Sequence, residues 1–156
     1  MSYTSAKSRP SYTFDANLQL KDAGLVAASA AATVDSAAQV LNVGTGFFEG
    51  EVVIDVTAIE VDTGNELYTI AIEGSDDSGF SSGTEVELCA LRLGDSSVTG
   101  TDTDNVVGRY TLPFNNRQIS GTTFSDGYCW PYIRLYTTVA GTIGTGINFT
   151  AFVVKH

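Results

Sequence analysis

The chain has 156 residues, of which 43% are hydrophobic and 17% charged, and its formal net charge at pH 7 is −10. This length suits one domain, and this hydrophobic fraction is sufficient for a core, so the composition excludes a chain that is disordered throughout. No segment approaches the roughly 20 apolar residues that cross a membrane, and the N-terminus lacks the apolar stretch of a secretion signal. We therefore expect a protein made in the cytoplasm, with no membrane partner.

The charge is distributed unevenly along the sequence. Residues 49–104 hold fourteen acidic residues and the single base Arg92, whereas residues 105–156 hold four basic residues and the single acid Asp126. Affinity for nucleic acid depends on Lys and Arg side chains that neutralise phosphates, so the acidic middle region argues against DNA or RNA as a partner. We expect this region to be a solvated surface that keeps the protein in solution.

The first 11 residues contain Lys7 and Arg9 but no acidic residue and no apolar run. Such a segment cannot contribute a core, so residues 1–11 are expected to be a flexible N-terminal arm and residues 12–156 the single folded domain. An arm of this kind can become ordered when it binds a partner. The residues that we expect to contact this partner are Lys7, Arg9 and Tyr12.

Apolar and polar residues alternate along most of the remaining chain, and a period of two residues is typical of half-buried strands. The alternation predicts strands at 12–20, 39–43, 51–58, 67–73, 85–93, 109–114, 132–139 and 147–153. Within 132–139, for example, Ile133 and Leu135 fall on one face, and Tyr132 and Arg134 on the other. The pattern shifts by one residue after Ala58, which predicts a β-bulge at that point.

Residues 27–38 contain seven alanines, which favour a helix by intrinsic propensity, but they offer no apolar stripe for a helix to bury. We expect a linker or a short helix there. About eight strands of this length predict an all-β fold, a two-sheet antiparallel sandwich. Within that class, a jelly roll is preferred over an immunoglobulin-like topology.

Residues suited to catalysis or metal binding are scarce. The one histidine, His156, is the last residue, and Cys89 and Cys129 do not have the spacing of a zinc site. Both cysteines lie in apolar segments and are expected to be buried free thiols. The acidic loop at 95–105 does not match the calcium-binding loop of an EF-hand, and we expect a solvated loop. We therefore predict no enzymatic activity, no catalytic residue, no metal and no cofactor.

Several of the predicted strands resemble segments of a known family. The segments are YTFDANLQLKDAG at 12–24, VVIDVTAIEV at 52–61, YTIAIEGS at 68–75, YIRLY at 132–136 and GINFTA at 146–151. Together they are similar to the capsid cement proteins of tailed bacteriophages, in particular those of short-tailed Bordetella-type phages. The likeness lies in the overall pattern and includes no catalytic signature.

The resemblance implies a jelly-roll decoration protein on the exterior of the virion, made in the host cytoplasm. It would bind the phage major capsid protein and bridge neighbouring subunits, which stabilises the shell. We also expect it to associate with copies of itself, as a dimer or alternatively a trimer, because linked weak contacts hold more tightly than single ones. The expected basic docking face consists of Arg109 and Arg117. The residues expected to mediate self-association are Leu91, Leu93, Tyr132 and Tyr136.

A second class of function stays open, namely a carbohydrate-binding or other ligand-binding β-sandwich module. Such a module presents exposed aromatic side chains in a row, and Tyr132 and Tyr136 beside Arg134 are the best candidates in this sequence. Binding to phage heads would favour the first class, and binding to glycans would favour the second.

Overall fold

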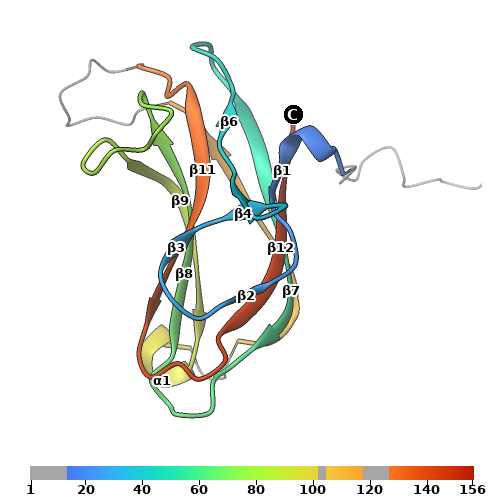
Figure 1. The fold of residues 1–156 in the computed structure, drawn as a ribbon, viewed down its shortest axis with the longest axis vertical. Helices are drawn as coiled ribbons and strands as arrows, with labels where there is room; N and C mark the ends of the chain where they lie inside the picture. Colours follow the sequence, from blue (N-terminus) through green and yellow to red (C-terminus); the bar gives the residue numbers. More distant parts are fainter. Residues whose placement is uncertain (1–13, 102–104, 118–126) are drawn as a thin grey trace, which may run out of the picture.

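A computed structural model describes residues 14–101, 105–117 and 127–156 (Figure 1). Its body consists of the long strands β7 (Glu49–Ile59), β8 (Leu67–Ser75), β9 (Val86–Gly94), β10 (Gly108–Asn115), β11 (Tyr132–Ala140) and β12 (Ile147–Lys155). The shorter elements before them are the 3-10 helix η2 (Ala16–Leu18) and the strands β1 (Gln19–Lys21), β2 (Leu25–Val26), β3 (Ala30–Ala31), β4 (Thr33–Val34), β5 (Ala37–Ala38) and β6 (Leu41–Asn42). A short helix, α1 (Ser96–Thr99), follows β9.

The strands form two antiparallel sheets that pack face to face (Figure 1). Sheet A has the order β1-β12-β7-β10, with β2 also paired to β12, and sheet B has the order β3-β11-β8-β9, with β6 also paired to β11. When β3 and β6 are treated as two halves of one strand, the first main strand pairs with the last, the second with the seventh, the third with the sixth and the fourth with the fifth. This nested pairing is the winding of a jelly roll, so the predicted all-β two-sheet sandwich is confirmed.

Alternate residues of the long strands fill the core between the sheets. Ile133 and Leu135 of β11 are fully buried, and so are Ile147 and Phe149 of β12. Because successive side chains of a strand point to opposite faces, the residues between them lie on the outer faces of the sandwich. The predicted inward and outward rows are therefore confirmed in these two strands.

The predicted bulge lies in β7. Val56 pairs with Phe149 of β12 and Ala58 pairs with Asn148, so Thr57 is an extra residue without an opposite partner. One inserted residue reverses the face of every residue that follows it. Ile59 therefore returns to the inner side, where it packs against the buried cluster.

Residues 27–38 do not form the short helix that was one of the two expectations. They contain β3, which pairs with β11, and β4 and β5, which pair with each other. The turn between β4 and β5 has positive φ angles at Asp35 and Ser36, and the Asp35 amide donates to the Asp22 carboxylate. Alanine side chains are too small to hold a helix against the sheets, whereas the backbone gains hydrogen-bond partners along the edge of β11. Tertiary pairing thus overrides helix propensity.

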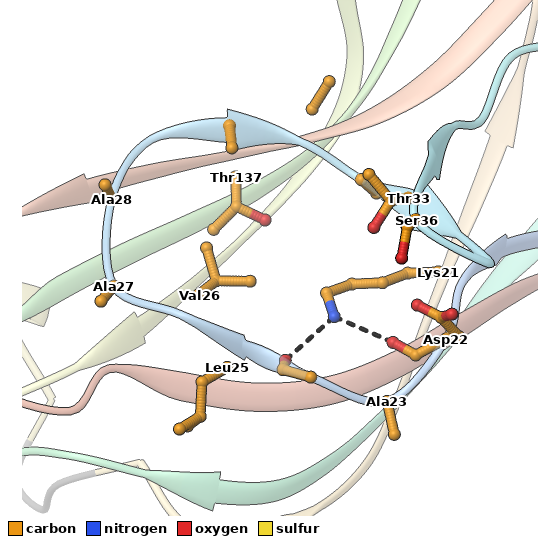
Figure 2. Close-up of a pocket in the computed structure, with 14 residues that line it drawn as sticks. Lys21, Asp22, Ala23, Leu25, Val26, Ala27, Ala28, Thr33, Ser36 and Thr137 are labelled. Atoms are coloured by element: carbon orange, nitrogen blue, oxygen red, sulfur yellow. Dashed lines mark hydrogen bonds between the residues drawn. The ribbon is translucent and has the colours of Figure 1, made fainter.

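The chain between β1 and β5 crosses from one sheet to the other at the edge of the sandwich. We call residues 21–36 the crossing loop, which carries β2 onto sheet A and β3 onto sheet B and is blue in Figure 1. The crossing loop encloses a pocket of about 550 Å3, shown in Figure 2. The first residue of the loop, Lys21, is buried despite its charge.

Candidate functional site

The structure does not assemble the predicted basic docking face. Arg109 lies near the start of β10 and Arg117 lies just beyond its end, which at the usual rise of a strand separates them by roughly 25 Å. Arg109 is also paired with Asp55 of β7, with its Nε 2.6 Å from Oδ1 of the carboxylate. The two arginines therefore do not form one face. All three predicted arm contacts lie outside the described residues, namely Lys7, Arg9 and Tyr12.

The residues predicted to mediate self-association separate into two groups. Leu93 is 1% exposed in the core, and Leu91 is half-buried and packs against the core cluster. Leu93 is not available to a second copy while the sandwich is intact, so we withdraw it from the predicted interface, whereas Leu91 on the edge strand β9 keeps a partly exposed surface. Tyr132 and Tyr136 are half-buried on the outer face of sheet B. A dimer or trimer stays a prediction, and it would have to use the tyrosines or another surface.

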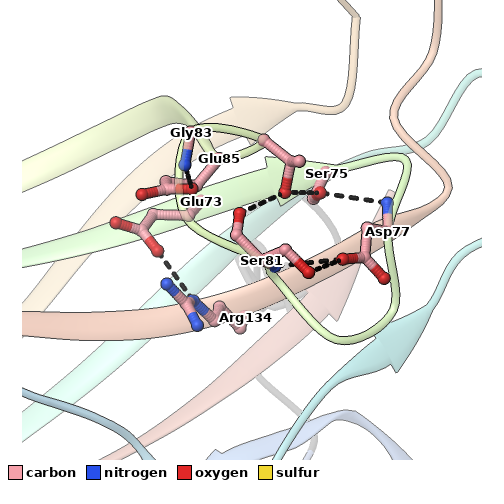
Figure 3. A network of polar contacts seen from close by, with 8 residues as sticks. Glu73, Ser75, Asp77, Ser81, Gly83, Glu85 and Arg134 are labelled. Carbon is pink, nitrogen blue, oxygen red and sulfur yellow. Dashed lines mark hydrogen bonds and ion pairs between the residues drawn. The ribbon is translucent and has the colours of Figure 1, made fainter.

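An arginine lies on the outer face of sheet B, near the start of β11 (Figure 3). The Arg134 Nε donates to Oε2 of Glu73 at 2.7 Å, and the side chains of both residues are mostly buried. The guanidinium also lies 4.3 Å from the ring centroid of Phe80 and 5.0 Å from that of Tyr136. Cations over aromatic faces are attracted by the ring quadrupole, so Arg134 holds two rings and one carboxylate together.

The loop at 75–85 brings Phe80 to this arginine. Asp77 organises the loop, because its carboxylate accepts hydrogen bonds from the Gly79 amide and from both the amide and the hydroxyl of Ser81. These bonds, with the Ser81 hydroxyl first, hold the pKa of Asp77 below its usual value. Phe80 has a positive φ and is buried. The loop thus places the Phe80 ring against the Arg134 guanidinium, which Tyr136 also contacts.

We expect Arg134→Met to lower the free energy of unfolding by about 2 kcal/mol, because Glu73 would keep a mostly buried charge without its partner. The double variant Arg134→Met/Glu73→Gln should recover part of this loss, since it removes the stranded charge. Urea unfolding of the wild type, both single variants and the double variant measures the coupling. Strictly additive effects would contradict this description of the pair.

One end of the sandwich brings together the two ends of the described chain (Figure 1). We call it the terminal end, and it consists of residues 14–18, 43–48, 116–117 and 155–156. Asn116 is its hub and is fully buried. Its side-chain oxygen accepts from the Phe48 amide at 2.8 Å, and its Nδ2 donates to the carbonyls of Gly46 and Trp130. The Asn116 backbone pairs with the same two segments, through Phe48 and Trp130. Asn116 therefore fixes the position of the loop at 43–48.

The surface of the terminal end carries an exposed aromatic ring and charges of both signs, with the acid Asp15 beside the basic side chains. Phe47 is 59% exposed, whereas the neighbouring Phe48 is buried, with the Lys155 ammonium 5.8 Å from its ring centroid. The exposed Arg117 and Lys155 carry positive charge there, and the His156 imidazole lies 3.4 Å from Glu51. Exposed aromatic side chains and arginine are enriched at protein–protein interfaces, so Phe47 and Arg117 mark this end as a candidate contact surface.

The opposite end is organised by buried or partly buried carboxylates. Glu66 is fully buried, and its oxygens accept hydrogen bonds from the amides of Thr63, Gly64 and Asn65 and from the Thr63 hydroxyl. Burial alone would raise the pKa of Glu66, but the hydrogen bonds led by the Thr63 hydroxyl outweigh it and lower this pKa to about 2. Glu66 therefore holds the turn at 62–66 as a charged side chain.

Glu60 performs the same role for a second loop. Its carboxylate accepts from the amides of Gly144, Thr145 and Gly146, which join β11 to β12. These bonds, that from Gly146 most strongly, lower the pKa of Glu60. The neighbouring loops of this end are thus anchored by two carboxylates.

The carboxylates of Glu60, Asp62 and Glu66 lie within 4.8 Å of one another, which makes them the group that could hold a cation among the residues that the structure describes. The oxygens of Glu60 and Glu66 are already engaged by backbone amides, so the geometry is that of loop anchors. In the loop at 95–105, Asp95 caps α1, because its side chain accepts from the Ser97 amide.

Both cysteines are free thiols, as predicted, but they are half-buried and not fully buried. Cys89 pairs with Ile72 of β8 across sheet B, and Cys129 pairs with Arg117 in an isolated bridge. Burial raises the pKa of Cys89 to about 11, which keeps this thiol protonated and unreactive at neutral pH.

No model of a protein family matches this chain, and no curated protein matches it significantly. Among the described residues, none of the helices has both the length and the apolar character that crossing a membrane requires.

Proposed function

We propose that the protein is a capsid cement protein that binds the outer surface of a phage head and bridges neighbouring major capsid subunits. The observation that supports this proposal is the jelly-roll winding, which is the fold implied by the resemblance. The resembling segments are also the segments that build the sandwich, since 52–61 overlaps β7, 68–75 overlaps β8 and 132–136 overlaps β11. In this role the protein has no catalytic residue, metal or cofactor and does not bind nucleic acid.

The terminal end is the surface that we propose to face the shell. Phe47 offers an exposed apolar contact, and Arg117 and Lys155 offer charges that can meet capsid carboxylates. The arm with Lys7 and Arg9 also joins the folded domain at this end. The carboxylate-rich opposite end, with Glu60, Asp62 and Glu66, would then point to solvent and keep the particle exterior acidic.

Cosedimentation with purified empty phage heads tests the proposal. We expect saturable binding to heads that lack their decoration protein and a higher temperature of head disruption once the sites are filled. Binding should weaken modestly with added salt, because charged contacts at the rim are screened over about 10 Å at 0.1 M while apolar contacts are not. Failure to sediment with heads at any ratio would contradict the proposed function.

Variants at the two ends separate the contact surface from general stability. Phe47→Ser should reduce head occupancy several-fold, since contacts of this kind supply much of the binding energy. Val107→Ser is the matched control, because Val107 is similarly exposed but precedes β10 at the opposite end. Both variants should unfold at the wild-type temperature. Loss of occupancy with Val107→Ser alone would reverse the proposed orientation.

Deletion of residues 1–9 tests the arm. Residues 1–9 hold no apolar run that could contribute to the core, so we expect thermal stability to change little, while head occupancy falls. Unchanged occupancy would exclude a docking role for Lys7 and Arg9.

The alternative function, glycan binding by a β-sandwich module, would use Tyr132 and Tyr136. Tyr136 is already engaged by Arg134, and Phe80 covers the same guanidinium. This arrangement favours the cement proposal over the sugar-binding one. Selective binding on a glycan array, together with no binding to heads, would reverse that preference.

A further inference from the structure

The pocket inside the crossing loop has the size of a small-molecule site. Its volume is about 550 Å3, and ligand pockets commonly span roughly 300 to 1,000 Å3. The walls consist mainly of alanines from the crossing loop, with Val26 and the side chain of Thr137 from β11 (Figure 2). Small side chains leave the space open, whereas larger ones at the same positions would close the sandwich edge. The pocket lies on the side of the fold and is separate from the surface proposed to face the shell.

A buried ammonium group lies in this pocket. Lys21 is 5% exposed, and its Nζ donates to the backbone carbonyls of Asp22 and Gly24 at 2.9 and 3.0 Å. It also lies 4.8 Å from the ring centroid of Phe149. No carboxylate oxygen of the described residues comes within 4.0 Å of it, because the Asp22 side chain accepts from the Asp35 amide instead. Burial lowers the pKa of Lys21, which the negative charge of Asp22 only partly opposes.

A buried charge of this kind is normally paired with an opposite charge. The carbonyl bonds orient the Lys21 ammonium but do not neutralise it. An anion that entered the pocket would supply the missing partner, and it would form a hydrogen bond stronger than one between neutral groups.

A second polar group, the hydroxyl of Thr137, faces the pocket. Thr137 is 1% exposed, lines the pocket and makes no hydrogen bond through its hydroxyl to any residue that the structure describes. Its neighbour on the same face of sheet B is Ala30 of β3, which leaves room beside the hydroxyl. The Thr137 hydroxyl is reached from the pocket and is free to bond to a ligand there. Figure 2 shows Thr137 and Lys21 directed into the same ring of backbone.

We propose that this pocket binds a small carboxylate that has a short apolar body. The carboxylate would accept hydrogen bonds from the Lys21 ammonium and the Thr137 hydroxyl, while the apolar body would pack on Val26 and the alanine walls. Two groups that the fold leaves incompletely satisfied would then be satisfied by one ligand. Asp22 also lines the pocket, and its charge selects against ligands with more than one negative charge.

Nuclear magnetic resonance of the isotope-labelled full chain tests the proposal with propionate as the probe and propionamide as its neutral isostere. We expect propionate to shift the amide signals of the crossing loop and of Thr137. It should also move the pKa of the Lys21 ammonium back toward its ordinary value. Propionamide should bind about tenfold more weakly, because a hydrogen bond to a charged group contributes more than one to a neutral group.

Substitutions inside the pocket locate the binding. Thr137→Val keeps the shape of the side chain and should weaken propionate binding about fivefold, as the loss of one buried hydrogen bond predicts. Ala30→Leu should abolish binding by filling the space beside Thr137. Thr138→Val is the matched control, since Thr138 is exposed on the outer face of the same strand, and it should bind as the wild type does.

Three results would overturn the proposal. Equal affinities for propionate and propionamide would show that the ammonium does not recognise a charge. Wild-type affinity in both Thr137→Val and Ala30→Leu would place the binding elsewhere. If high concentrations of propionate leave the amide signals of the crossing loop unchanged, the pocket does not bind this class of ligand. None of these results depends on binding to phage heads.

Discussion

Asn116→Ala should lower the free energy of unfolding by about 3 to 4 kcal/mol, because it leaves three buried or partly buried hydrogen-bonding groups of two segments without partners. The Phe48 amide loses its acceptor, and the carbonyls of Gly46 and Trp130 lose their donor. Urea unfolding followed by circular dichroism measures this loss.

Asn42→Ala is the control for the loss of an asparagine in general. Asn42 is exposed, and among the residues that the structure describes its side chain accepts from the Gly44 amide alone, so we expect a loss below about 1 kcal/mol. Because Asn116 holds the loop that carries Phe47, its replacement should also reduce head occupancy at temperatures where the variant is still folded. Equal stabilities of the two variants would show that Asn116 is not the hub of the terminal end.

Glu66→Gln should lower the free energy of unfolding by about 3 kcal/mol at neutral pH, since a charged acceptor of four hydrogen bonds is replaced by a neutral amide with one acceptor oxygen. The effect depends on pH because the pKa of Glu66 is depressed to about 2 in the folded protein. A depressed pKa stabilises the fold above the unfolded value, near 4.5, and this contribution is lost as the pH falls through about 2.

The stability difference between the wild type and Glu66→Gln should therefore be constant above about pH 5 and shrink steadily between pH 4.5 and 2. Unfolding curves at several pH values measure it, with Glu87→Gln as the control, because Glu87 is exposed on β9. A difference that does not change over this pH range would mean that the Glu66 carboxylate is not held in its charged form.

The sandwich could be predicted from the sequence because its long strands bury one face each. In β11, Ile133 and Leu135 alternate with Tyr132 and Arg134, and this period is visible without any knowledge of the neighbouring strands. The shift in β7 was visible for the same reason, since an inserted residue changes the face of Ile59. Residues 27–38 carried no such signal, because alanine fits a helix, a strand edge or a loop equally well.

The polar hubs could not be predicted because their partners are distant in the sequence. Asn116 binds residues near position 48 and near position 130, and an asparagine in a loop is ordinarily a turn residue. The same holds for Lys21, whose burial follows from the path of the crossing loop over it. The alternation in β11 places Arg134 on the same face as Tyr132 and Tyr136, so its contact with a tyrosine could be predicted. Its contact with Phe80 could not, because it depends on the conformation of the loop at 75–85.

Electron cryomicroscopy of empty phage heads decorated with this protein tests the central proposal most directly. We predict density for a jelly roll on the outer surface, seated at the junction of neighbouring capsid subunits, with the terminal end and Phe47 against the shell and Glu66 toward solvent. Heads without added density at saturating protein would contradict the cement function. Density seated on the end that contains Glu60 and Glu66 would contradict the proposed orientation.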